Sequence, residues 1–362
     1  MYTELIKIIE GGLNNDKNKV ISYSKHLAKK LKDDGADKLA NKITSTLEAS
    51  TSFPVYKDQL FDAPVDNDTR LNIADIILPQ DIKLEINISD SVKDPIDNFI
   101  SLVNSKNEIN NKGIHINLSM LLYGPPGCGK TTLAKHIAKE LEIPIVIARF
   151  DSLISSLLGN TAKNIRKLFD YAKNKPCILF LDEFDAIAKA RDDNHETGEL
   201  KRVINSLLQN IDDFLETGIL IAATNHEQLL DSAIWRRFEK IINVNKPDSL
   251  EIKTLVETYL KRIESDIDVN DKKYDALLAN FLGLSHSEII KIINSSYYNS
   301  IIKNRTLEHY DILTEYFKYN NNNRYTTEEL IRFLSESNIS QKHIAGFLDI
   351  SIRQVRNAIN VE

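Results

Sequence analysis

The sequence predicts an α/β protein with additional all-helical parts. From about residue 86 to residue 246, short apolar segments alternate with amphipathic ones, the pattern of a parallel β-sheet covered by helices on both faces. A glycine-rich segment follows the first clear apolar strand, and an Asp-Glu pair ends the third. From residue 247 onward helical periodicity replaces the strand pattern. These observations predict a sheet domain followed by helical domains.

The composition is that of a folded globular protein. The chain has 362 residues, enough for roughly two or three folding units, and its net charge of −6 gives no overall basic field for nucleic acid or lipid. It lacks an apolar run of about 18 residues and a signal-peptide start, so we expect no membrane span and a cytoplasmic location. Two cysteines without metal-binding spacing favour a reducing compartment and no protein-ligated metal cage.

The chain divides into five successive segments. Residues 1–50 have the 3–4 spacing of three short helices, an N-terminal bundle that is either a stability cap or a docking domain for a partner. Residues 51–85 have several prolines and no periodicity, which indicates a linker. Residues 86–246 form the larger α/β domain, and residues 247–319 a small helical lid. After a polar break that we interpret as a hinge, residues 324–362 form a helical tail. The expected strands are 120–123, 145–148, 177–181, 219–223 and 241–244.

The glycine-rich segment at residues 124–131 has the form Gly-x-x-x-x-Gly-Lys-Thr between a strand and a helix, which is the phosphate-loop motif in its required context. Its glycines let backbone N–H groups face phosphate oxygens. Lys130 is expected to neutralise the β- and γ-phosphates of ATP, and the Thr131 hydroxyl to bind Mg²⁺. The residues expected to bind nucleotide are Pro126, Gly127, Cys128, Gly129, Lys130, Thr131 and Thr132.

The buried strand at 177–181 ends in Asp182 and Glu183. Carboxylates at the C-terminal edge of a parallel sheet face the ligand crevice. We expect Asp182 to hold Mg²⁺ together with Thr131, and Glu183 to polarise the water that attacks ATP.

With the strand 219–223, which leads to Asn225, these motifs resemble those of the AAA family of phosphate-loop ATPases across roughly residues 86–315. The resemblance implies that Asn225 orients the lytic water. It also implies that Arg236 and Arg237 are arginine fingers reaching the ATP of a neighbouring subunit, although surface salt bridges are the alternative. A second-sensor arginine is absent and Ser287 takes its place, which favours the protein-remodelling group of the family. Leu157 and Leu158 occupy the position of the pore loop, where other members have an aromatic residue, and ordinary packing is the alternative there.

The tail resembles a helix-turn-helix over residues 340–359. Ala345 and Val355 would lie between the helices, and Asp349 stands where a glycine is usual. The second helix would present Arg353, Gln354, Arg356 and Asn357, residue types that bind phosphates and base edges. Residues 324–362 are neutral, however, with five basic and five acidic residues. DNA contact and a plain docking or assembly module therefore both remain open.

The arrangement of these parts resembles bacterial AAA ATPases that accompany a subtilisin-like serine protease. The leading hypothesis is an ATP-hydrolysing homo-oligomer, a ring of six, that remodels a protein client or delivers it to such a protease. The alternative is a DNA-associated regulator that uses ATP as an assembly switch. The required cofactors are ATP and Mg²⁺.

Overall fold

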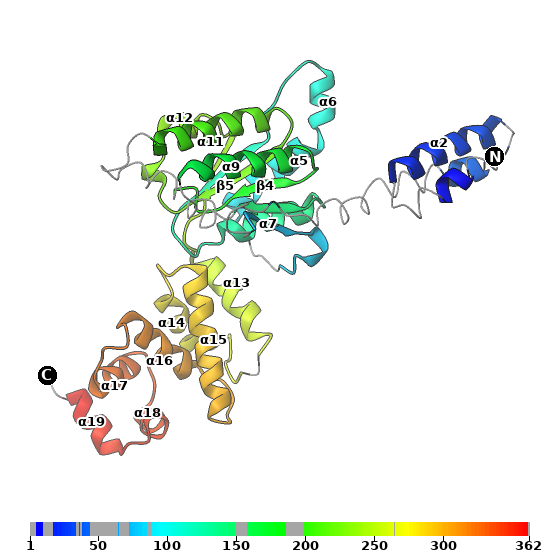
Figure 1. Cartoon of the computed structure of the whole chain (residues 1–362). Coiled ribbons are helices and arrows are strands. Elements are labelled where there is room, and N and C mark those ends of the chain that lie inside the picture. The colour runs from blue at the N-terminus through cyan, green and yellow to red at the C-terminus, as the bar shows by residue number, and fades with distance from the viewer. Residues whose placement is uncertain are drawn as a thin grey trace. The chain divides into compact units, whose positions relative to one another are not determined.

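The computed structural model describes residues 5–9, 17–33, 36, 38–43, 64, 72–84, 88–148, 158–185, 199–263 and 265–360 (Figure 1). The chain separates into two compact units, Met1–Val65 and Asp66–Glu362. Within the described residues, no helix is both long and apolar enough to cross a membrane.

The described residues of the first unit contain three helical segments, at residues 5–9, at α2 (Lys17–Asp33) and at residues 38–43. Leu27 and Ala28 of α2 are buried, as is Ala40 of the third segment. Leu5 and Leu39 are exposed. So small a unit has too little interior to cover the apolar face of every helix.

The second unit is built on a six-stranded sheet with the order β1-β3-β4-β5-β2-β6. The strands are β1 (Ala74–Ile77), β2 (Ser119–Tyr123), β3 (Ile145–Ala148), β4 (Ile178–Leu181), β5 (Ile219–Thr224) and β6 (Lys240–Asn243). All neighbouring strands are parallel except β1, which pairs with β3 in the antiparallel direction. The predicted α/β class is confirmed, with strand ends shifted by one residue in places.

The strand β1 corrects the sequence prediction, which assigned residues 51–85 to a linker and gave the sheet five parallel strands. Ala74 pairs with Ala148 and Ile77 with Ile145 at the edge of the sheet. Four residues are too few to establish a period, and an edge strand with one buried residue in four lacks the continuous apolar run of the central strands. The short helix η1 (Pro79–Asp81) follows it.

Helices cover both faces of the sheet because side chains along each strand point alternately to opposite sides. On one face, Leu121, Leu179 and Ala222 pack with α9 (Leu158–Lys173) and α11 (Glu199–Leu215). On the other, Met120, Phe180 and Ala223 share a core with α5 (Asp90–Asn104) and α7 (Lys130–Glu140). The shorter elements are α6 (Lys106–Asn111), η2 (Glu227–Leu229) and α12 (Ser232–Trp235).

The lid consists of α13 (Ser249–Leu260), α14 (Lys272–Asn280), α15 (His286–Ile302) and α16 (His309–Asn320). Two of its helices begin with capping boxes. Asp248 pairs with Glu251 at α13, and Ser285 pairs with Glu288 at α15. Each box satisfies backbone N–H groups that a helix start leaves without partners.

The tail consists of α17 (Thr327–Glu336), α18 (Gln341–Leu348) and α19 (Ile352–Asn360). Its buried residues belong to the same hydrophobic cluster as those of the lid, with Leu334 and Val355 joined to Ile312. The Phe317 ring of α16 stacks on that of Phe333 of α17, with centroids 4.8 Å apart. From the sequence, the polar break is interpreted as a hinge. It is instead a turn bridged by aromatic packing, because apolar side chains on both sides of it pack against one another.

This shared core predicts that the lid and the tail unfold together. Leu334 is completely buried, so Leu334→Ala should lower the free energy of unfolding by about 2–5 kcal/mol. The exposed Leu282 of the lid is the matched control, and Leu282→Ala should change stability by less than about 0.5 kcal/mol. Hydrogen exchange of α15 and α19 should accelerate together in Leu334→Ala. Acceleration of α19 alone would show that the tail is an independent domain.

Candidate functional site

The glycine-rich loop between β2 and α7 has a backbone that its glycines make possible. Gly124 has φ 137°, and a Cβ atom there would lie 2.3 Å from the carbonyl oxygen of Val244. Gly127 has φ 75°, and its Cβ would lie 2.7 Å from the Ser285 hydroxyl. A side chain at either position would be both strained and blocked. The loop thus forms a tight backbone turn that leads directly into the N-terminus of α7.

The Lys130 side chain lies under this loop and is buried. Its Nζ donates hydrogen bonds to the carbonyl oxygens of Gly124, at 2.7 Å, and of Pro125, at 2.8 Å. Burial lowers the pKa of Lys130, and nearby negative groups such as Asp182 and Asp185 partly oppose this shift. The ammonium group therefore lies within the loop, held by two of its backbone carbonyls.

Thr131 and Asp182 meet at the edge of the sheet. The Thr131 Oγ1 donates a 2.7 Å hydrogen bond to Asp182 Oδ2, and the backbone N–H of Glu183 donates to Asp182 Oδ1 at 3.0 Å. A hydroxyl and a carboxylate held together are oxygen ligands of the kind that Mg²⁺ prefers. The structure thus brings together the two residues predicted to bind the metal.

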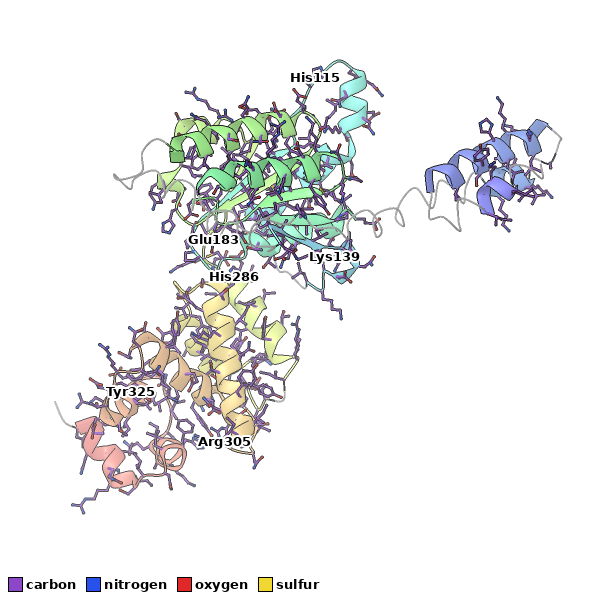
Figure 2. All side chains as sticks on the ribbon, viewed as in Figure 1. His115, Lys139, Glu183, His286, Arg305 and Tyr325 are labelled. Carbon is purple, nitrogen blue, oxygen red and sulfur yellow. The ribbon has the colours of Figure 1, made fainter. Side chains whose placement is uncertain are left out.

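Glu183 has a left-handed backbone, with φ 50°, which costs a residue with a side chain about 1–2 kcal/mol. The turn is held in place by the next residue, since the N–H of Phe184 donates to the carbonyl of Ala223 on β5 at 2.8 Å. Glu183 is exposed, and Figure 2 shows it at the end of the α/β domain from which the lid begins. Backbone strain of this kind is typical of functional positions.

Asp185 is a residue of the site that the sequence analysis missed. It is buried, and its Oδ1 accepts hydrogen bonds from the Thr224 hydroxyl at 3.1 Å and from the Asn225 N–H at 3.4 Å. Asp185 thereby joins the segment after β4 to the end of β5. Its signal in the sequence was a third carboxylate after the Asp-Glu pair. A buried carboxylate needs hydrogen-bond donors, and the sequence did not show which residues would donate.

Asn225 lies where β5 ends, on the strand between β4 and β2. It is half-buried, with its backbone fixed by Asp185. The strand order therefore places the end of β5 between the strand that leads to the phosphate loop and the strand that leads to Glu183. The role of Asn225 in orienting water stays a prediction.

Arg236 and Arg237 follow α12, but the structure separates their roles within one chain. Arg237 makes two hydrogen bonds with the Asp212 carboxylate of α11, at 2.7 and 2.8 Å, and these bonds raise the pKa of Arg237. Arg236 is exposed and has no ion-pair partner among the described residues. The surface salt bridge weighed as the alternative role is thus formed by Arg237, while Arg236 is available to another molecule.

A cavity of about 590 Å³ adjoins the phosphate loop, lined by Cys128, Thr132, Lys246, Tyr259 and His286 among others. The His286 Nδ1 is buried without a hydrogen-bond partner among the described residues. Burial lowers the pKa of His286, so the ring is neutral at neutral pH. The cavity joins apolar walls, an unpaired ring nitrogen and a loop for phosphate, and these features fit the base and phosphates of a nucleotide.

The start of α15 contacts the phosphate loop directly. The N–H of Ser287 donates to the carbonyl of Gly127 at 3.1 Å. On the same turn, Glu288 accepts 2.6 Å hydrogen bonds from the Ser285 N–H and from the Tyr319 hydroxyl at the end of α16. Burial acts to raise the pKa of Glu288, but these hydrogen bonds outweigh it and lower the pKa. A short series of contacts thus leads from the phosphate loop to the junction between lid and tail.

The two pore-loop candidates cannot be assessed in the same way. Leu157 lies outside the described residues, and Leu158 is the first residue of α9, with a side chain outside the described part. Their role stays a prediction.

Comparison with known proteins gives a consistent result. Residues 120–246 match the family model described as "ATPase family associated with various cellular activities (AAA)". An uncharacterized AAA family ATPase of Sinorhizobium fredii is 43% identical over 198 residues, which is 55% of this chain and 58% of that protein. A putative 26S proteasome regulatory subunit homolog of Methanocaldococcus jannaschii is 33% identical over 52% of this chain and 51% of its own length.

The ATP-dependent zinc metalloprotease FtsH 2 of Bdellovibrio bacteriovorus is 34% identical over 54% of this chain and 33% of its own length. The chain therefore spans no more than about three fifths of these relatives.

The hydrogen bond between Tyr319 and Glu288 yields a prediction with a pH signature. Tyr319→Phe should lower the free energy of unfolding by about 1–2 kcal/mol at neutral pH, because a charged acceptor loses its donor. Since the pKa of Glu288 is lowered on folding, this contribution is present above the ordinary glutamate pKa of about 4.3 and is lost as the pH falls through the lowered value.

Denaturant titrations at neutral and acidic pH measure this effect. The control is Tyr298→Phe at an exposed position of α15, which should leave stability unchanged. An equal loss for Tyr319→Phe at both pH values would mean that the charge of Glu288 plays no part.

Proposed function

We propose that this chain, which belongs to the AAA family of ATPases through its domain at residues 120–246, hydrolyses ATP at contacts between identical subunits. The observation that supports hydrolysis best is the 2.7 Å hydrogen bond between Thr131 and Asp182, beside the buried Lys130. A hydroxyl, a carboxylate and an ammonium group at one sheet edge are the groups that a magnesium nucleotide requires.

Each residue of the site has a proposed role in ATP hydrolysis that follows from its position. The phosphate loop, with Lys130, binds and orients the phosphates. Thr131 and Asp182 would hold Mg²⁺, which supplies positive charge against the phosphate oxygens when bound. Glu183 accepts the proton of the attacking water, and Asn225 orients that water. The strained backbone of Glu183 keeps its carboxylate out of the hydrogen-bond network that occupies Asp182 and Asp185.

A neighbouring subunit would supply the arginine that the chain lacks beside its own phosphate loop. At the start of α15, next to the loop, the chain has Ser287 rather than an arginine, and it contributes a backbone N–H there. Arg236 is exposed on the same domain without a described partner. We therefore assign Arg236 as the finger that reaches the ATP of a neighbouring subunit, and Arg237 as the residue that anchors its segment through Asp212. AAA family members commonly assemble into oligomers, and we propose a homo-oligomer, with six subunits as the ring size.

The work done by this ring is proposed to be the remodelling of a protein client. Relatives with related domains are named as a proteasome regulatory subunit homolog and an ATP-dependent protease, both of which handle proteins. The N-terminal unit exposes Leu5, Ile6 and Ile9, apolar side chains suited to selecting a client. Delivery of that client to a separate serine protease is the further step that the arrangement of domains suggests.

The role of Glu183 predicts a separation of binding from chemistry. Glu183→Gln keeps the shape of the side chain but removes the base, so ATP hydrolysis should fall by about 10²–10⁴-fold while ATP remains bound. Lys130→Ala should instead weaken ATP binding itself. Phosphate release and nucleotide retention measure the two effects, and normal hydrolysis by Glu183→Gln would refute the assignment of the base.

The role of Arg236 predicts complementation between two inactive variants. Arg236→Ala should lower turnover by about 10³-fold, without the loss of stability expected for the control Arg237→Ala. Mixing Arg236→Ala with Glu183→Gln should restore activity, because sites form in which one chain provides Glu183 and its neighbour provides Arg236. ATPase activity measured against mixing ratio tests this, and a mixture that stays inactive would place Arg236 in its own chain's site.

A further inference from the structure

The tail forms a compact three-helix arrangement with a tight turn between its last two helices (Figure 1). Asp349 ends α18 with a left-handed backbone of φ 54° and ψ 47°, and the N–H of Ile350 donates to the carbonyl of Ala345 at 3.0 Å. Ala345 and Val355 are buried between the helices. Aspartate tolerates this backbone better than most residues with a side chain, so the absence of glycine at this position does not prevent the helix-turn-helix geometry.

The outer face of α19 presents one continuous polar stripe. Its buried positions are Val355 and Ala358, which face the shared core. Arg353, Arg356, Asn357 and Asn360 are exposed at positions i, i+3, i+4 and i+7, the spacing of a single helix face. Gln354, which the sequence also assigned to this face, accepts hydrogen bonds from the Ser351 N–H and hydroxyl and thereby caps the helix.

The stripe lies against the start of α18 in a defined way. The Arg356 Nε donates a 3.2 Å hydrogen bond to Gln341 Oε1, so the first turn of α18 lies beside the middle of α19. The adjacent Lys342 is exposed there. Arginine and asparagine pair in bidentate fashion with guanine and adenine edges, and an exposed lysine at a helix start meets phosphate.

The tail has no net charge, but most of its acidic residues lie on α17 and most of its basic residues on α18 and α19. The helix α17 bears three exposed glutamates, Glu328, Glu329 and Glu336. The helices α18 and α19 contain Lys342, Arg353 and Arg356 but no acidic residue, and Asp349 lies in the turn between them. The net charge of the whole segment, which argued against nucleic acid, therefore does not describe the face that α18 and α19 present.

We infer that this face binds double-stranded DNA, with α19 placed in the major groove and Lys342 at a phosphate. The anchors of protein interfaces are mostly Trp, Tyr and Arg in fully desolvated pockets. The exposed stripe has arginine and asparagine without an aromatic side chain, and Ile352 is the large apolar side chain exposed on α18 and α19. This inference does not depend on ATP hydrolysis, and it gives the assembly a location on DNA in addition to its proposed work on a client.

Three cations predict a measurable salt dependence. If Lys342, Arg353 and Arg356 each neutralise one phosphate, affinity should fall about 40-fold between about 50 and 200 mM salt. With the two arginines removed, one cation remains and the fall should be about three- to fourfold. Several tails in one oligomer make the dependence steeper.

The experiment uses the full chain and a fluorescent 30-base-pair duplex, with anisotropy measured at both salt concentrations. The wild type should bind with the steep dependence, and Arg353→Ala/Arg356→Ala should lose at least about tenfold in affinity at the lower salt. The matched control is Arg324→Ala, an exposed arginine of the same tail outside this face, which should bind like the wild type. Arg353→Lys/Arg356→Lys should keep most of the salt-dependent binding. ATPase activity, measured on each variant, should not change.

Three results would overturn the inference. The first is no binding by the wild type at about 100 µM protein in the lower salt, the weak end of the usual range of non-specific dissociation constants. The second is equal loss in Arg324→Ala and in the α19 variant, which would mean a diffuse charge effect. Capture of a protein client through α19 without duplex binding would likewise assign this face to protein docking. Unchanged ATPase activity in those cases leaves the proposed hydrolysis standing.

Discussion

The hydrogen bond from Thr131 to Asp182 joins residues 51 positions apart, and it depends on how the strands of the sheet are aligned. Ala222 of β5 is paired with Leu121 of β2 on one side and with Leu181 of β4 on the other. This parallel register makes three strands end at the same edge. The phosphate loop, the Asp182 segment and Asn225 are therefore neighbours because of backbone hydrogen bonds and core packing beneath them, where Leu121, Leu179 and Ala222 are fully buried.

Polar side chains that are excluded from the core gather at this edge of the sheet. Most of them have hydrogen-bond partners within the chain. Asp185 receives two hydrogen bonds from the end of β5, and Lys130 donates to two loop carbonyls. Glu183 is the exception, since its backbone is left-handed and its side chain is exposed. Strain at one residue surrounded by satisfied neighbours suits a group whose partner arrives with the substrate.

The contacts beyond the sheet suggest how nucleotide and tail are linked. The start of α15 touches the phosphate loop at Gly127, and Glu288 on that turn is bonded to Tyr319, where the lid meets the tail. Because the lid and the three tail helices share one hydrophobic cluster, α15 and the tail are packed as one unit.

The sequence alone determined the α/β class, the central strands, the helix starts at Asp248 and Ser285, and the phosphate-loop and Asp-Glu motifs. These features are local, because a strand pattern, a capping box or a loop with required glycines is written in a few neighbouring residues. Tertiary structure alone decided the antiparallel edge strand β1, the role of Asp185 and the different surroundings of Arg236 and Arg237. It also joined the lid to the tail. Each of these depends on which distant residue a side chain or strand edge meets, and such pairing is set by packing rather than by any pattern along the chain.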